Sequence, residues 1–285
     1  MLKKFEKMNQ CGNLYIVATP IGNLADMAPR AVATLKKVNC IAAEDTRHSA
    51  PLLHYFQITT PVVSYHDHNE REQTPLLIER LVAGEEIALI SDAGTPLIND
   101  PGFQLIRAAI AQNISIIPLP GANAIICALS GAGIPSDRFV FEGFLPAKNK
   151  ARRDHLIELR HEPRTLVFYE SPYRLLETLT DLIEIFGGTR QAVIARELTK
   201  IHETFLRDTL ENLAILVQSD ANQQRGEIVL IVAGAPEISE LAEREAEAQR
   251  IFAILQSELP ASQAVALAAK ITGVRKNPLY SLLIK

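Results

Sequence analysis

The chain has few of the features that mark secreted, membrane-embedded or metal-binding proteins. Its three cysteines, Cys11, Cys40 and Cys127, are widely spaced and form neither a CxxC pair nor a set with metal-ligand spacing. We interpret them as buried thiols in a reducing cytoplasm and expect no metal site. No run approaches the roughly 20 apolar residues that cross a membrane. The early lysines are not followed by the apolar segment of a signal peptide, so we expect a cytoplasmic protein.

An excess of basic charge is also missing. The formal net charge of -4 argues against a protein that coats nucleic acid non-specifically, because counterion release needs clustered lysine and arginine. Two local basic clusters interrupt this acidic background, and they include Lys148, Lys150, Arg152 and Arg153 in mid-chain and Arg275 and Lys276 near the end. Either cluster alone is more often a solvated surface, but the two together favour a polyanionic partner.

Short runs rich in Ile and Val alternate with helical patterns, which predicts an α/β architecture with largely parallel strands. Strands of a first domain are expected at 14–18, 40–44, 61–65, 87–91 and 114–118. Strands of a second domain are expected near 139 and at 165–170, 192–197 and 227–234. The predicted domains are 12–118, 119–236 and a helical segment, 237–285. Pro29 and Pro101 are each expected in the first turn of a helix.

The helical segment begins with a long charged amphipathic pattern and continues with an alanine-rich helix. That helix is expected to end at Thr272-Gly273, where glycine can adopt the left-handed cap, and a short helix should follow Pro278. Two helices joined by a Gly-containing turn with basic residues resemble a helix-turn-helix unit. Such a unit could bind RNA or form a dimer contact.

The first predicted strand is not followed by the glycine fingerprint of nicotinamide-binding enzymes or by a phosphate-binding loop, which disfavours both classes. It is followed instead by ATPIGNL, residues 18–24. Pro20 and Gly22 give a tight turn that could approach a ligand, and Asn23 can accept hydrogen bonds from free amides at the next helix. Taken alone, this segment is better explained as an ordinary strand-to-helix turn.

The strongest segment for ligand binding is SDAGTPLINDPG, residues 91–102. Asp92 follows a buried strand and is suited to a cationic or hydroxyl-bearing ligand, and Gly94 and Thr95 can form a wall of backbone groups. The alternative is a turn that only starts the next helix. A second strand-to-helix turn, PGANA, ends in small residues, and the free amides of its helix are expected to face a cleft and a flat ligand.

Dense ionisable residues end two further strands, in EDTRHS and HDHNE. The candidates for acid-base work or phosphate binding are Asp45, Arg47, His48, His66, Asp67, His68 and Glu70. A metal site at the two histidines is disfavoured because no third cluster has suitable spacing. In the second domain, Glu170, Arg196, Glu197 and Lys200 could form a structural ion-pair network or contact a ligand.

The order of ATPIGNLADM, AAEDTRHS, HDHNE, SDAGTPLINDPG, EGFLPAK, FYESPYR and ARELTK resembles the tetrapyrrole methylase superfamily. More narrowly, the chain resembles the ribosomal RNA small subunit methyltransferase I family, which transfers a methyl group to a cytidine ribose 2'-hydroxyl of bacterial 16S rRNA. The similarity covers about residues 12–234, and the tail is similar to the family's helical extension.

The resemblance implies two α/β domains of the tetrapyrrole methylase type with S-adenosylmethionine in the cleft between them, plus an all-helical C-terminal extension. It also implies a homodimer, no metal, and the small ribosomal subunit as partner rather than DNA. The implied cofactor contacts are Pro20, Gly22, Asp92, Ala93, Gly94, Thr95, Leu97, Ile98, Ala122, Asn123, Tyr169, Leu198, Glu227, Ile228 and Val229.

For catalysis, Asp45, His66 or His68 could accept the hydroxyl proton, and Arg47 could position a phosphate. The RNA contacts expected are Lys148, Lys150, Arg152, Arg153, Arg275 and Lys276. Two other functions remain open. One is a methyltransferase of the same fold acting on a tetrapyrrole or a modified protein side chain, and the other is a non-catalytic RNA-binding assembly factor.

Overall fold

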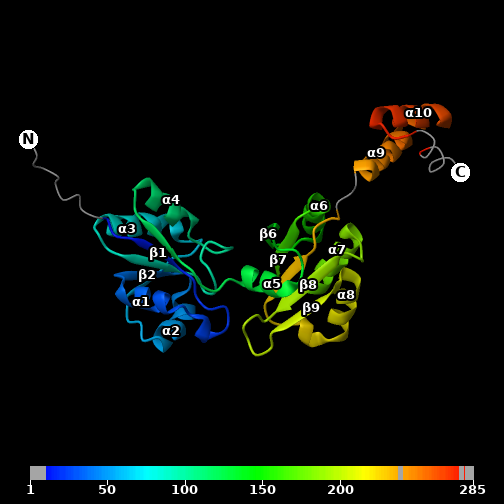
Figure 1. The fold of residues 1–285 in the computed structure, drawn as a ribbon. Helices are drawn as coiled ribbons and strands as arrows, with labels where there is room; N and C mark the ends of the chain where they lie inside the picture. The colour runs from blue at the N-terminus through cyan, green and yellow to red at the C-terminus, as the bar shows by residue number, and fades with distance from the viewer. Residues whose placement is uncertain (1–10, 237–239, 276–278, 280–285) are drawn as a thin grey trace, which may run out of the picture. The chain divides into compact units, whose positions relative to one another are not determined.

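The computed structural model describes residues 11–236, 240–275 and 279, and the chain divides into two compact units, Met1–Gly234 and Ala235–Lys285. The first unit contains two five-stranded sheets, built from β1–β5 and from β6–β10 (Figure 1). The two sheets confirm the predicted α/β fold. The predicted domain boundary after residue 118 stays a prediction.

The first sheet is entirely parallel, with strand order β3-β2-β4-β1-β5. Its strands are β1 (Leu14–Val17), β2 (Cys40–Ala43), β3 (Val62–Ser64), β4 (Ile87–Ile90) and β5 (Ile116–Leu119). The helices of this region are α1 (Pro29–Lys37), α2 (Thr46–Tyr55), α3 (Glu70–Val82) and α4 (Phe103–Ala111), with a short 3₁₀ turn η1 (Leu24–Asp26). All five predicted strands are present.

Helices cover both faces of this sheet, as a parallel sheet requires (Figure 1). On one face, Leu35 of α1 and Leu53 of α2 join a core cluster with Ile41 and Ile90. On the other face, α3 and α4 contribute a separate cluster. Every residue of the central strands β2 and β4 is buried, which explains their uninterrupted apolar sequences.

The second sheet, in the order β6-β7-β10-β8-β9, differs from the prediction in strand direction. Only β6 (Phe139–Phe144) and β7 (Thr165–Glu170) pair in parallel. The strands β8 (Gln191–Arg196), β9 (Thr204–Thr209) and β10 (Ile228–Val232) form antiparallel pairs with their neighbours. The expectation of largely parallel strands is therefore wrong for this sheet. The edge strand β9 was not predicted, because it is only partly buried and carries charged residues.

The helices of the second sheet are α5 (Ala124–Ala132), α6 (Asn149–Leu159), α7 (Leu175–Phe186) and α8 (Leu210–Ser219), with a 3₁₀ turn η2 (Ala221–Gln224). Side chains of α6, α7 and α8 form the core on one face of the sheet. Side chains of α5 cover the other face, where the cluster also includes Ile21 from the loop after β1 and Ile98 from the loop after β4. This cluster connects loops of the first sheet to the second sheet.

Several local predictions can be compared with the structure. Pro29 is the first residue of α1, as expected. Pro101 is not in a helical turn, because α4 begins at Phe103 after Gly102, whose φ of 131° few other residues adopt. The three cysteines are free, but only Cys40 is buried, and the expectation of buried thiols is wrong for the partly exposed Cys11 and Cys127.

The second unit contains α9 (Glu240–Leu255) and α10 (Ala261–Thr272). Phe252 of α9 packs with Val265 and other small side chains of α10 in a core of its own. Gly273 ends α10 with a left-handed φ of 75°, which confirms the predicted cap. The helix predicted after Pro278 lies outside the described residues, apart from the buried Leu279. Among the residues described, no helix is long and apolar enough to cross a membrane.

Candidate active site

A cavity of about 450 Å³ lies in the first unit, where strand ends of both sheets contribute loops. The first sheet supplies Ile21, Glu44, Asp92, Ala93, Gly94, Thr95, Ile98, Asn99 and Asp100, and the segment that starts α5 supplies Asn123 and Ala124. The second sheet supplies Phe144, Tyr169, Glu170, Ser171, Pro172, Leu198, Gly226, Glu227, Ile228 and Val229. Because β10 is antiparallel to β7 and β8, its first residues lie beside the last residues of those strands.

The loop after β4 forms one wall of the cavity and is held by its backbone. The Thr19 amide donates to the Gly94 carbonyl at 2.8 Å, and the Gly94 amide donates to the Thr19 carbonyl at 3.0 Å. The Thr95 hydroxyl donates to the Ala122 carbonyl at 3.0 Å. Gly94 has a φ of 84°, and a β-carbon there would come within 3.3 Å of Ile21. The loop is therefore shaped in advance of any ligand.

Unusual backbone angles gather in the two loops beside the cavity. Leu97 and Asn99, in the loop after β4, have φ values of 74° and 65°. Glu197 and Thr199, in the loop after β8, have φ values of 52° and 65°. Positive φ is unfavourable for residues with a β-carbon, and such strain is concentrated at functional sites.

Carboxyl groups dominate the polar part of the cavity at the ends of β2 and β4. Asp92 accepts a hydrogen bond from the Asp45 amide at 3.1 Å, and Glu44 accepts one from the Asp92 amide at 3.3 Å. Burial raises the pKa of Glu44. Burial, with the charges of Glu44, Asp92 and Asp67, raises the pKa of Asp100 to about 6. No lysine or arginine is among the described residues that line the cavity, so this wall favours a cation.

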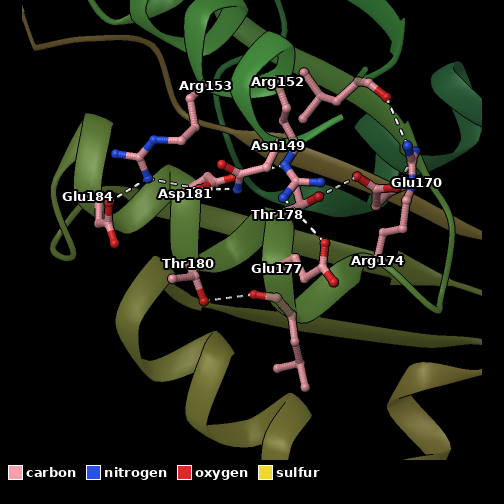
Figure 2. A network of polar contacts seen from close by, with 12 residues as sticks. Asn149, Arg152, Arg153, Glu170, Arg174, Glu177, Thr178, Thr180, Asp181 and Glu184 are labelled. Atoms are coloured by element: carbon pink, nitrogen blue, oxygen red, sulfur yellow. Dashed lines mark hydrogen bonds and ion pairs between the residues drawn. The ribbon is translucent and has the colours of Figure 1, made fainter. Parts of the chain in front are cut away.

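Among the cavity-lining residues of the second sheet, Glu170 has a fully buried side chain, which lies near Arg174 and Thr178 (Figure 2). It accepts hydrogen bonds from Arg174 at 2.7 Å, from the Ser171 amide at 2.6 Å and from Thr178 at 2.6 Å. Arg174 also donates to the Leu145 carbonyl at 3.1 Å. Ion pairing and hydrogen bonding at Glu170 thus connect β7, α7 and the loop after β6.

The loop after β8 carries a second ion-pair network. Lys200 pairs with Glu197 at 2.8 Å and with Glu227 at 3.0 Å. Arg196 instead donates to Thr204 and to two backbone carbonyls. One role that the sequence predicts for these residues is a structural ion-pair network, and the contact between Glu197 and Lys200 confirms it for that pair.

Most of the predicted cofactor contacts line the cavity: Asp92, Ala93, Gly94, Thr95, Ile98, Asn123, Tyr169, Leu198, Glu227, Ile228 and Val229. Pro20, Gly22, Leu97 and Ala122 do not line it, although each is next to a residue that does. Sequence reasoning missed Glu44 and Asp100 as lining residues. Both lie inside motifs that had been singled out, so their position at strand ends and in the long loop could have indicated them.

The predicted catalytic residues lie at the same edge of the sheet but not among the cavity-lining residues. Asp45 caps α2 and pairs with Arg47 at 2.9 Å, and this contact lowers the pKa of Asp45 and makes it a weak proton acceptor. The Arg47 side chain is 90% exposed. The ring centroids of His66 and His68 lie 5.9 Å apart, and the buried His66 Nδ1 has no hydrogen-bond partner among the residues that the structure describes.

The start of α5 differs from the prediction of free amides facing the cleft. The Asn123 side chain accepts hydrogen bonds from the Ile125 and Ile126 amides at 3.0 and 3.2 Å. These amides are therefore capped by the chain itself. The predicted cap at Asn23 is confirmed, since it accepts from the Ala25 amide at 3.0 Å.

The four residues of the mid-chain basic cluster differ in their exposure to solvent. Lys148 and Lys150 are exposed at the start of α6. Arg152 is 1% exposed and donates to Asp181 of α7 at 2.6 Å, so its prediction as an RNA contact is wrong (Figure 2). Arg153, half-exposed, pairs with Asp181 and Glu184. Arg152 lies on the face of α6 that packs on α7, where a buried cation needs a carboxylate partner.

Arg275 is exposed in the second unit, and Lys276 lies outside the described residues. Among the residues that the structure describes, no group of three or more His, Cys, Asp or Glu side chains is arranged to hold a metal ion.

The fold agrees with comparisons to known proteins. Residues 13–214 match the family described as Tetrapyrrole (Corrin/Porphyrin) Methylases. Uroporphyrin-III C-methyltransferase from Thermus thermophilus, solved in complex with S-adenyl homocysteine, has a TM-score of 0.52 at 16% identity, covering 78% of this chain and 97% of that one. Diphthine synthase has a TM-score of 0.58 at 14% identity, covering 78% and 90%. The chain belongs to the tetrapyrrole methylase family.

Curated relatives narrow this assignment. Proteins named ribosomal RNA small subunit methyltransferase I are 57% identical in Pseudomonas aeruginosa, covering 94% of this chain and 95% of that protein, and 52% identical in Escherichia coli O157:H7, covering 95% and 94%. Residues 242–285 match the RsmI C-terminal HTH domain. Within the tetrapyrrole methylases, the chain is a member of the ribosomal RNA small subunit methyltransferase I family, as its motifs had indicated.

The buried ion pair predicts a large effect of Asp181→Ala. Removing this carboxylate leaves the Arg152 guanidinium buried without its closest partner, and we expect a loss of about 3–5 kcal/mol in the free energy of unfolding. Urea denaturation measures this loss. Glu184→Ala, at the exposed end of the same network, is the control and should cost less than about 1 kcal/mol. Equal effects of the two substitutions would contradict this account.

Proposed function

We propose that this protein uses S-adenosylmethionine to methylate the ribose 2'-hydroxyl of a cytidine in the decoding region of 16S rRNA. The family assignment supports methyl transfer, and the relatives' name supports the small-subunit RNA as acceptor. The structural observation that carries the proposal is the acid-lined cavity at the strand ends of the first unit.

The residues present fit this cofactor. A volume of about 450 Å³ lies within the range of roughly 300–1,000 Å³ that small-molecule sites occupy. The sulfonium and ammonium groups of S-adenosylmethionine are cations, which suit the wall of Glu44 and Asp92. Its adenine is flat and largely apolar, which suits the side chains of Leu198 and Val229.

The residues that would hold the cofactor are the predicted contacts that line the cavity: Asp92, Ala93, Gly94, Thr95, Ile98, Asn123, Tyr169, Leu198, Glu227, Ile228 and Val229. When bound, the cofactor supplies an electrophilic methyl group. The chain itself contributes a preformed loop, held by Thr19 and Gly94, and a rim fixed by Glu170. Such groups accelerate transfer by orienting the reactants and excluding water.

The RNA is proposed to contact Lys148 and Lys150, which are exposed at the start of α6, a few residues after the cavity-lining Phe144. The half-exposed Arg153 could add to this surface, and the exposed Arg275 of the second unit is proposed as a separate RNA contact. A homodimer and a cytoplasmic location remain part of the proposal. Arg47, His66 and His68 follow β2 and β3, at the edge of the sheet where the cavity lies, and could contact the RNA backbone near the acceptor ribose.

The function is tested by transfer of labelled methyl from S-adenosylmethionine to small ribosomal subunits from cells that lack this protein. We expect label on one cytidine ribose of 16S rRNA. Label on a base would contradict the proposed acceptor atom. Absence of label on RNA, with label on a tetrapyrrole or a protein side chain, would favour the first alternative, and RNA binding without cofactor binding would favour an assembly factor.

The cavity is tested by Ala93→Trp. Ala93 is exposed on the cavity wall, so an indole there should occupy the space of the ligand without disturbing the core. We expect S-adenosylhomocysteine to bind at least tenfold more weakly by calorimetry, with an unchanged melting temperature. Ala50→Trp, an exposed position on α2, is the matched control. Unchanged affinity in the Ala93 variant would place the cofactor elsewhere.

The RNA surface is tested by the double substitution of Lys148 and Lys150 by alanine. Each lysine that contacts a phosphate contributes about 0.7–0.9 to the slope of log affinity against log salt. We expect weaker binding of small-subunit RNA and a slope reduced by roughly 1–2. Alanine at Lys36 and Lys37, exposed in the last turn of α1, is the control. An unchanged slope in the first variant would exclude these contacts.

A further inference from the structure

The carboxyl groups of the cavity differ in what holds them. Glu170 is bound by Arg174, Thr178 and a backbone amide, and Glu227 pairs with Lys200. Both side chains are therefore paired with cations, and both hold neighbouring segments of the chain together.

The two carboxylates at the ends of β2 and β4 also have structural tasks. Asp92 accepts from the Asp45 amide, and Glu44 accepts from the Asp92 amide. Each hydrogen bond connects one strand end to its neighbour and takes one carboxylate oxygen.

Asp100 is different. In the part of the chain that the structure describes, no backbone amide and no cationic side chain holds its carboxyl group, although the Ser91 side chain is near enough to favour the charged form through a hydrogen bond. Its position in the cavity is set by the backbone, between Asn99, which has a φ of 65°, and Pro101. The loop thus places a carboxyl group in the cavity without pairing it with a cation.

The groups that face Asp100 are acidic or neutral. Glu44, Asp67 and Asp92 approach from the ends of three strands of the first sheet, and Tyr169 of β7 lies on the other side. Partial burial, together with these charges, raises the pKa of Asp100 to about 6. Burial, together with the charge of Asp100, raises the pKa of Tyr169 to about 12. A general base works best when it is unengaged and has a pKa near the working pH. Asp45, by contrast, is committed to Arg47.

We propose that Asp100 is the catalytic residue that accepts the proton of the acceptor hydroxyl, an inference that rests on the proposed methyltransferase function. As the hydroxyl oxygen bonds to the methyl carbon, the bond from that carbon to sulfur breaks and its electron pair stays on sulfur. The hydroxyl proton passes to the Asp100 carboxylate and then to water. Charge and atoms balance without a further reactant.

The first test compares Asp100→Asn with Asp137→Asn. Asp137 is exposed before β6, at the end of that strand away from the cavity-lining Phe144, so it controls for the loss of one charge. For Asp100→Asn we expect S-adenosylhomocysteine to bind within threefold of the parent by calorimetry. Methyl transfer at saturating cofactor should fall by about 10²–10⁴-fold. In the parent, kcat/KM should fall on the acid side, where protonation of Asp100 removes the base, and this acid limb should disappear in the variant.

The second test needs no cofactor. The folded pKa of Asp100, about 6, exceeds its ordinary value of 3.8, so the folded state loses stability as the pH rises from about 4 through 6. Above pH 6 the charged carboxyl destabilises the fold. Asp100→Asn should therefore melt at a higher temperature than the parent at pH 8, and the difference should shrink at pH 5.

Three results would overturn the role of Asp100. One is a rate in the Asn variant within threefold of the parent. Another is a loss of more than tenfold in cofactor affinity with an unchanged rate at saturation, which would make Asp100 an anchor for the cation. The third is a melting-temperature difference that does not change with pH. Failure of the proposed function is distinguishable, because the parent itself would then not bind S-adenosylhomocysteine or methylate the RNA.

Discussion

The parallel direction of β1 to β5 is the constraint on which the candidate site depends. Because all five strands leave the sheet at one edge, the loops that carry Ile21, Glu44, Asp92 and Asp100 gather there, although they are far apart in the sequence. The second sheet also brings residues from several strands to one edge, although its strands are mostly antiparallel. Its strand β10 is antiparallel, so the start of β10 joins the ends of β7 and β8 in lining the cavity.

The carboxyl groups that line the cavity are of two kinds. Some hold neighbouring segments of the chain together, and one, Asp100, has no such structural role. Glu170 fixes the rim through α7, and Glu44 with Asp92 connects neighbouring strand ends. Asp100 is positioned by the backbone of its loop and has no cationic partner among the described residues, in surroundings that disfavour its charge. A bound cation would relieve that repulsion, so the same electrostatics that destabilise the free protein favour binding of a positively charged ligand.

Much of this could be predicted from the sequence, for physical reasons that also explain what was missed. The buried strands of the first sheet are uninterrupted apolar runs, and strand-end loops with Gly and Asp are visible without a structure. Strand direction in the second sheet is not encoded locally, and β9 has the mixed composition of an edge. Arg152 and Lys150 look alike in the sequence, but only the packing of α6 on α7 decides which one is buried. Asp100 lies well beyond a strand end, and the turns at Leu97 and Asn99 return it to the cavity.

The backbone of the two cavity loops has a consequence for how this protein can change. Of the six non-glycine residues with positive φ in the described chain, four are Leu97, Asn99, Glu197 and Thr199, beside the cavity. Glycine at these positions would remove a steric conflict and so stabilise the folded protein against heat. The same substitutions would make the loops more flexible, and the cavity-lining groups that they carry would be held less precisely. Heat-stable variants that keep full activity are therefore expected to carry their stabilising substitutions outside these two loops.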